Sequence, residues 1–246
     1  MSKFSNKTVF VTGASSGLGL ATAQHFANQG ANVFAVGRNE TALQQLSDSS
    51  SHISTGIMEL SDSASCSSAI QACIEQYGGL DVLVNAAGKH QLHHSTDVSD
   101  EDWERDLAVN ISGPFYLCRA AIPYLLESKG NIVNVASIAG LSGQPYSAGY
   151  CSAKHALIGL TRALALEYMH SELRVNVICP GGMDTPQVQN FSFPDGVDFD
   201  LVMRSSALRG MMQAEDVAAV IAFLASDDAK TIHGAVYPVD QGKLVG

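Results

Sequence analysis

The stretch of sequence that decides the fold is Thr12-Gly13-Ala14-Ser15-Ser16-Gly17-Leu18-Gly19. It follows a short apolar run at residues 8–11 and opens a helical pattern that extends to residue 29. Glycines at such a junction allow a tight turn and a close approach of the backbone to a phosphate. The first helical turn adds free N–H groups and the positive end of the helix dipole. An ordinary glycine-rich turn is the alternative, but the placement between a strand and a helix favours a dinucleotide site.

Apolar runs alternate with helical patterns along the whole chain. The predicted strands are residues 8–11, 32–36, 52–58, 81–84, 131–136, 174–178 and 235–239. The predicted helices are residues 18–29, 41–46, 63–77, 100–127, 150–170 and 214–225. Several of the strands are apolar on both faces, as a parallel sheet covered by helices requires. The pattern predicts an α/β fold, a single Rossmann-like domain over residues 1–246 with a doubly wound sheet of about seven parallel strands.

One long segment, residues 181–212, has no clear periodicity but contains several methionines and phenylalanines. Long irregular stretches in compact domains are usually functional or disordered. Because the apolar content argues against plain disorder, we interpret residues 182–212 as a substrate lid. Its few cations favour a small, largely apolar substrate over a highly charged one.

The composition narrows the classes of partner. The 246 residues carry a net charge of −10, and no basic face indicates nucleic-acid binding. No apolar run reaches the ~18 residues that a membrane-spanning helix needs, and the N-terminus has no apolar signal region. The five cysteines are scattered without a C-x-x-C pair, which is typical of reduced thiols. We therefore expect a cytoplasmic protein that acts on a small molecule.

Tyr150 and Lys154 lie four residues apart, about one helical turn, so a phenol and an ammonium would project from one helix face. A nearby positive charge favours the phenolate, so we expect a lowered pKa for Tyr150 and a role as general acid or base. Ser137, thirteen residues before Tyr150, could bind the oxygen whose proton moves. Chance spacing on a helix is the alternative for the pair taken alone.

The end of the second predicted strand reads Val36-Gly37-Arg38-Asn39. An acidic residue there would bind the ribose hydroxyls and repel a 2′-phosphate, whereas Arg38 could pair with that phosphate. The sequence therefore favours NADP as the cofactor, with NAD as the alternative. Arg38 could also be a solvated loop cation.

Together these motifs resemble the classical short-chain dehydrogenase/reductases, from Lys7 to Gly242. The glycine spacing of residues 12–19, the Asn85-Ala86-Ala87-Gly88 segment, the order of Asn110, Ser137, Tyr150 and Lys154, and Pro180-Gly181 with Thr185 carry the resemblance. The resemblance implies a catalytic tetrad. In it Ser137 would polarise the substrate oxygen, Tyr150 would transfer its proton, Lys154 would hold the nicotinamide ribose, and Asn110 would anchor a water. It also implies a homotetramer or dimer, with residues 150–170 at one interface.

Pro114 gives independent support for the Asn110 water. A proline has no N–H to donate to the carbonyl four residues earlier, and that carbonyl belongs to Asn110. A helical segment here would leave the carbonyl free to hold a water, unless the proline only bends the helix.

The resemblance also places the cofactor and the substrate. The expected cofactor-binding residues are Gly13, Ser15, Ser16, Leu18, Gly19, Arg38, Glu59, Leu60, Asn85, Ala87, Gly88, Tyr150, Lys154, Pro180, Gly181, Met183 and Thr185. The expected substrate contacts are Ser137, His90, Gln144, Tyr146 and Met183. Three positions depart from the family pattern. Glu59 replaces an aspartate, Ala86 replaces an asparagine, and Val239-Asp240-Gln241-Gly242 replaces Asp-Gly-Gly.

The function predicted is an NAD(P)-dependent oxidoreductase that moves a hydride between the nicotinamide and a ketone or secondary alcohol, such as a 3-oxoacyl-type carbonyl. Two alternatives are a catalytically silent dinucleotide sensor, and an epimerase or dehydratase of the same superfamily. His90, His93 and His94 form a cluster that invites a metal site. We predict no metal, because no carboxylate or cysteine has a matching spacing.

Overall fold

The computed structural model describes residues 2–204, 206 and 209–245. Its strands are β1 (Thr8–Thr12), β2 (Asn32–Gly37), β3 (Ile53–Ile57), β4 (Val82–Asn85), β5 (Asn131–Val135), β6 (Arg174–Pro180) and β7 (Val236–Val239). They form one seven-stranded sheet in the order β3-β2-β1-β4-β5-β6-β7, with every neighbouring pair parallel. The predicted α/β fold and doubly wound sheet are confirmed, and no strand end differs from its prediction by more than two residues.

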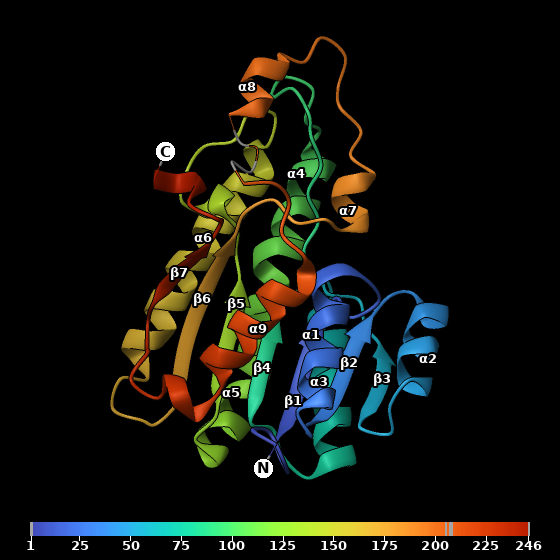
Figure 1. Ribbon diagram of the computed structural model, residues 1–246, viewed down its shortest axis with the longest axis vertical. Helices are drawn as coiled ribbons and strands as arrows, with labels where there is room; N and C mark the ends of the chain where they lie inside the picture. Colours follow the sequence, from blue (N-terminus) through green and yellow to red (C-terminus); the bar gives the residue numbers. More distant parts are fainter. Residues whose placement is uncertain (1, 205, 207–208, 246) are drawn as a thin grey trace.

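The helices are α1 (Gly17–Asn28), α2 (Glu40–Asp48), α3 (Ser63–Tyr77), α4 (Asp100–Leu107), α5 (Gly113–Ser128), α6 (Ala148–Glu167), α7 (Pro186–Gln189), α8 (Phe199–Met203) and α9 (Ala214–Ala225). Successive side chains of β1 point to opposite faces of the sheet, so they contact different helices. Val9 and Val11 join the core beneath α1 and α9, whereas Phe10 joins the core beneath α3 and α5. Figure 1 shows α1 and α9 in front of the sheet. The sheet is thus covered on both faces, as its apolar strands predict.

The single helix predicted over residues 100–127 is wrong. A π-helical turn, η1 (Ala108–Ser112), separates α4 from α5. The physical reason lies at Pro114, which lacks an N–H and forces the backbone bonds around it to rearrange. The N–H of Gly113 donates to the carbonyl of Ala108, five residues back. Such π-turns are frequent at functional sites, and the fully buried Asn110 lies within this one.

The segment without periodicity contains the two short helices α7 and α8. A parallel bridge between Met183 and Met212 closes its base, with the N–H of Met212 bonded to the carbonyl of Gly182. Figure 1 shows this orange segment beyond the carboxyl ends of the strands. Helices of four and five residues are too short to produce a periodic pattern, which explains why the sequence did not predict them.

Within the described residues, no helix is both long enough and apolar enough to cross a membrane.

Candidate active site

A cavity of about 880 Å³ opens at the carboxyl ends of the strands. The order β3-β2-β1-β4 reverses direction at β1 and β4, which is where ligands bind in doubly wound sheets. The walls come from the glycine-rich turn after β1, the ends of β2, β4, β5 and β6, and the segment that contains α7 and α8. Its volume falls in the range of about 300–1,000 Å³ that is usual for ligand pockets.

The glycine-rich turn is built by close backbone contacts. Gly13 has a φ of +72°, and a Cβ there would lie 2.9 Å from the Cα of Ala87. A Cβ on Gly19 would lie 2.3 Å from the carbonyl oxygen of Gly13. Only glycine fits at either position, so the turn can pass beneath the loop that follows β4 and still present the start of α1 to the cavity.

Two serine side chains at this end of the cavity leave polar groups unsatisfied within the described residues. Ser16 is the N-cap of α1, but its side chain makes no capping hydrogen bond. The hydroxyl of Ser15 is buried and has no partner among the described residues. Free N–H groups at the helix start together with an unpaired hydroxyl are what a pyrophosphate or ribose phosphate needs. The residues present therefore fit a nicotinamide dinucleotide.

Most of the residues predicted for the cofactor meet in this one cavity. Those that line it are Gly13, Ser15, Ser16, Leu18, Gly19, Arg38, Glu59, Leu60, Ala87, Gly88, Tyr150, Lys154, Pro180, Gly181, Met183 and Thr185. The geometry brings together residues that lie up to 172 positions apart, from Gly13 to Thr185.

Asn85 is not among the residues that line the cavity. Its amide donates to Oδ1 of Asn134 at 2.8 Å and to the sulfur of Cys118 at 3.4 Å. Asn134 in turn donates to the hydroxyl of Thr161 on α6. The side chain of Asn85 is thus a buried link between β4, β5 and α5, and its predicted cofactor contact stays a prediction.

Tyr150 and Lys154 both lie in α6, as predicted, and both are buried. The ammonium lies 5.6 Å from the centre of the phenol ring and donates to the carbonyl of Val135 at 2.9 Å. Ser137 follows two residues after Val135, directly after β5, and its hydroxyl accepts from the N–H of Ala139 at 3.1 Å. The end of β5 and the first turns of α6 thus bring the three side chains to one wall of the cavity.

The expected lowering of the tyrosine pKa is wrong. Burial raises the pKa of Tyr150 to about 12, and the hydrogen bond with Ser137 opposes only part of this effect. Burial also lowers the pKa of Lys154 to about 8. Burial penalises the charged form of each group, so its effect has opposite signs for an acid and a base. At neutral pH the phenol is protonated and the ammonium keeps most of its charge.

Asn110 lies behind this wall and does not line the cavity. Its amide donates to the carbonyls of Lys89 and Asp106, at 2.9 and 3.0 Å, and its Oδ1 accepts from the N–H of Lys89 at 3.2 Å. A Cβ on Gly88 would lie 3.0 Å from Oδ1 of Asn110 and 3.2 Å from Nζ of Lys154. The asparagine side chain therefore fixes the loop after β4 against Lys154, a contact that the sequence did not indicate.

The substrate half of the cavity contains four of the five predicted contacts, Ser137, His90, Gln144 and Met183. Tyr146 does not line it. Its hydroxyl accepts from the N–H of Asp198 at 2.9 Å, and its ring packs edge-on against His94 at 5.1 Å. The side chain thus contacts Asp198, directly before α8, and the predicted substrate contact of Tyr146 stays a prediction.

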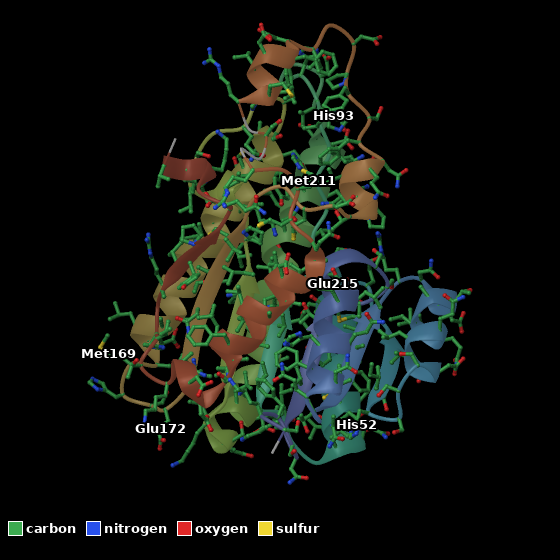
Figure 2. The ribbon with its side chains drawn as sticks, in the orientation of Figure 1. His52, His93, Met169, Glu172, Met211 and Glu215 are labelled. Atoms are coloured by element: carbon green, nitrogen blue, oxygen red, sulfur yellow. The ribbon has the colours of Figure 1, made fainter. Side chains whose placement is uncertain are left out.

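The three clustered histidines have separate surroundings. His90 stacks on Tyr150, and His94 bonds to the carbonyl of Asp195 at 2.8 Å. Figure 2 shows His93 at the upper end of the molecule, near α4. No group of three metal-binding side chains was found among the described residues.

Comparison with known proteins agrees with this geometry. A family model described as enoyl-(acyl carrier protein) reductase matches residues 13–243. Meso-2,3-butanediol dehydrogenase of Serratia marcescens is 37% identical over 98% of this chain and 95% of its own. Short-chain dehydrogenase/reductase olcF of Penicillium canescens is 36% identical over 98% of this chain and 97% of its own.

A solved structure is similar over the whole fold. It is that of 3-ketoacyl-(acyl-carrier-protein) reductase from Brucella melitensis, complexed with NADH. It has a TM-score of 0.89 and 29% sequence identity, and the match covers 97% of this chain and 98% of that one. The chain belongs to the short-chain dehydrogenase/reductase family and is an oxidoreductase that uses a nicotinamide dinucleotide.

Proposed function

We propose that this protein reduces a small ketone to a secondary alcohol with NADPH, with Tyr150 as the proton donor. The observation that carries the proposal is the protonated, buried Tyr150 beside Ser137 and Lys154 at the wall of the dinucleotide cavity. The cofactor, when bound, supplies a hydride for the carbonyl carbon. The protein must supply a proton for the oxygen and keep the substrate in place.

The side chains divide these tasks. The Ser137 hydroxyl binds the carbonyl oxygen and polarises it. Tyr150 donates its proton as the oxygen gains charge, which leaves a phenolate. Lys154 stabilises that phenolate because its ammonium lies against the ring and is held by the Val135 carbonyl. In the reverse direction the phenolate accepts the proton of an alcohol. The test is turnover, and absence of ketone reduction with both NADPH and NADH across a broad panel would contradict the proposal in favour of a silent sensor.

The preference for NADP is proposed from the end of β2. Gly37 has no carboxylate that could bind the ribose and repel a phosphate, and a Cβ there would lie 2.2 Å from the hydroxyl of Ser15, which would have to turn away. Arg38, the next residue, is exposed and lines the cavity. Its guanidinium is a suitable donor for a 2′-phosphate.

We therefore expect Arg38→Gln to weaken NADPH binding about 10-fold, equivalent to ~1.4 kcal/mol, and to leave NADH binding nearly unchanged. Titration of both cofactors by calorimetry measures the ratio. Lys230→Gln, an exposed change outside the cavity, is the control. Tighter binding of NADH than of NADPH by the unaltered protein would assign NAD instead.

Residues 182–212 are proposed to act as a substrate lid. Phe191, Phe193, Val202 and Met211 line the cavity from this segment, and Figure 2 shows Met211 beyond the carboxyl end of the sheet. Tyr146 and His94 bond to the backbone of Asp198 and Asp195, so two loops of the catalytic face hold the segment in place.

Tyr146→Phe removes one of these two bonds and keeps the aromatic contact with His94. Because a single hydrogen bond contributes ~0.5–1.5 kcal/mol, we expect the KM for the ketone to rise about two- to tenfold. Steady-state kinetics at saturating cofactor measures this. Tyr124→Phe, which removes a surface bond to Gln71, should leave KM unchanged. Equal KM values for Tyr146→Phe and the wild type would contradict a lid held by this bond.

A homo-oligomer is proposed as well. Leu166 and Met169, at the end of α6, are 67% and 56% exposed, and Figure 2 shows Met169 at the edge of the molecule far from the cavity. A second copy of the chain would cover these apolar side chains, and light scattering measures the mass.

A further inference from the structure

His90 is held rigidly between two aromatic rings. Its imidazole is nearly parallel to the Tyr150 phenol, with ring centres 4.1 Å apart and an angle of 15° between the planes. On its other side the edge of Phe191 packs at 5.0 Å. His90 also lines the substrate half of the cavity. A ring clamped in this way cannot turn freely, so its two nitrogens keep fixed directions.

The Ser147 hydroxyl has two neighbours, the carbonyl of Pro145 at 3.1 Å and Nε2 of His90 at 2.8 Å. The carbonyl can only accept, so a Ser147 hydrogen directed to it leaves the hydroxyl oxygen to accept from Nε2. In this arrangement Nε2 carries a hydrogen. Burial and the nearby Lys154 charge lower the pKa of His90 to about 4, so the ring is neutral at physiological pH. Its Nδ1 is consequently a bare acceptor.

Within the described part of the chain, Nδ1 of His90 has no hydrogen-bond partner. It is not one of the buried polar atoms without a partner, so it remains accessible to solvent. An acceptor in this position binds an O–H or N–H group and disfavours another acceptor, such as a carboxylate oxygen. His90 and Tyr150 stack with their ring centres 4.1 Å apart and both line the cavity, so a small molecule held beside Tyr150 also meets the imidazole.

The remaining wall is suited to a compact, uncharged substrate. Leu92, Val109, Phe191 and Val202 are apolar, and the Gln144 amide is neutral. Besides Arg38 and Lys154, two further cations, Lys89 and Arg105, line the cavity, but Arg105 is already paired with Asp102 and bonded to Gln91. An anionic substrate at these cations is the competing possibility, and the experiment below includes it.

We propose that the substrate is an uncharged ketone with a hydroxyl on the neighbouring carbon, reduced to a vicinal diol, and that His90 is the specificity-determining residue which accepts that hydroxyl's hydrogen. The inference rests on the proposed function and deepens it. The reaction remains balanced, since the hydride reaches the carbonyl carbon, the Tyr150 proton reaches its oxygen, and the second hydroxyl stays intact.

The first test compares three ketones of similar size with the wild-type protein. They are acetoin, butanone, which lacks only the hydroxyl, and acetoacetate, which carries a carboxylate. We expect kcat/KM for acetoin to exceed that for butanone by about 10- to 100-fold, because bound butanone covers the Nδ1 acceptor without pairing it. Equal values for acetoin and butanone would overturn the inference. A preference for acetoacetate would overturn it in favour of an anion site at Lys89 and Arg105.

The second test replaces His90. His90→Phe keeps an aromatic ring against Tyr150 but has no acceptor, so the ratio of kcat/KM for acetoin over butanone should fall to near one. His90→Asn restores an acceptor oxygen and should recover part of the ratio, which a merely structural role would not produce. His155→Phe, an exposed histidine on α6, is the control and should keep the ratio.

Each outcome has a distinct meaning. A ratio that survives His90→Phe overturns the role of His90. If His90→Phe does not fold, as judged by thermal unfolding, His90→Asn carries the test, with a ratio below that of the wild type expected. Turnover of none of the three ketones, with reduction of other ketones in the broad panel, overturns the inference alone, whereas no turnover across the whole panel with either cofactor contradicts the proposed function as well.

Discussion

The Tyr150→Phe protein is expected to reduce ketones about 10²- to 10⁴-fold more slowly than the wild type, while its affinity for the dinucleotide stays within about twofold. The change removes only the hydroxyl. The ring, its contact with His90 and the position of the Lys154 ammonium are set by packing and by the bond to Val135. Substrate would still bind, but no group could protonate its oxygen. Turnover is followed by nicotinamide absorbance, and affinity by calorimetry.

Tyr237→Phe is the matched control, because that phenol lies on the edge strand β7, 42% exposed and outside the cavity. It should retain full activity. Near-normal turnover by Tyr150→Phe would remove the phenol from the mechanism, whatever the binding data show.

Gly13→Ala is the second change with a large expected effect. Alanine at a φ of +72° costs ~1–2 kcal/mol, and its Cβ would overlap the Cα of Ala87 at 2.9 Å. Either the turn or the loop after β4 must move, and both line the cavity. We expect the dinucleotide dissociation constant to rise at least about 10-fold, and the free energy of unfolding to fall by ~1–3 kcal/mol.

Gly79→Ala is the control, since its Cβ would meet nothing within 4 Å and its backbone is not left-handed. It should change the free energy of unfolding by less than about 0.5 kcal/mol. Unaltered dinucleotide affinity in Gly13→Ala would show that the glycine-rich turn does not hold the cofactor.

The sheet could be predicted from the sequence because its strands are buried on both faces. Residues 131–135, for example, are all buried, and a short run of this kind is typical of a strand in a parallel sheet that helices cover on both faces. The turn after β1 could be predicted for a similar reason, because Gly13 and Gly19 each meet backbone atoms that exclude any side chain. A helix boundary could not be predicted where a single residue changes the backbone hydrogen bonds, as Pro114 does between α4 and α5.

Most of the residues that meet at the site could be predicted, but the hydrogen-bond partners of their side chains could not. Asn85 and Tyr146 are polar and lie in the expected segments, yet each side chain turns to partners far away in the sequence, Asn134 and Asp198. The pKa of Tyr150 differs from its prediction because sequence spacing reveals the nearby Lys154 but not the burial, which raises the pKa. The stacking of His90 on Tyr150 joins residues sixty positions apart, and no local pattern reveals it.

The most direct test of the central claim is to follow the hydride itself. The protein is incubated with acetoin and NADPH that carries deuterium at the transferable C4 position, and the product is examined by mass spectrometry. We expect a diol with one deuterium at the former carbonyl carbon in the wild type, and almost none formed by Tyr150→Phe. A diol without deuterium, with cofactors labelled on either face of the ring, would contradict hydride transfer at this site.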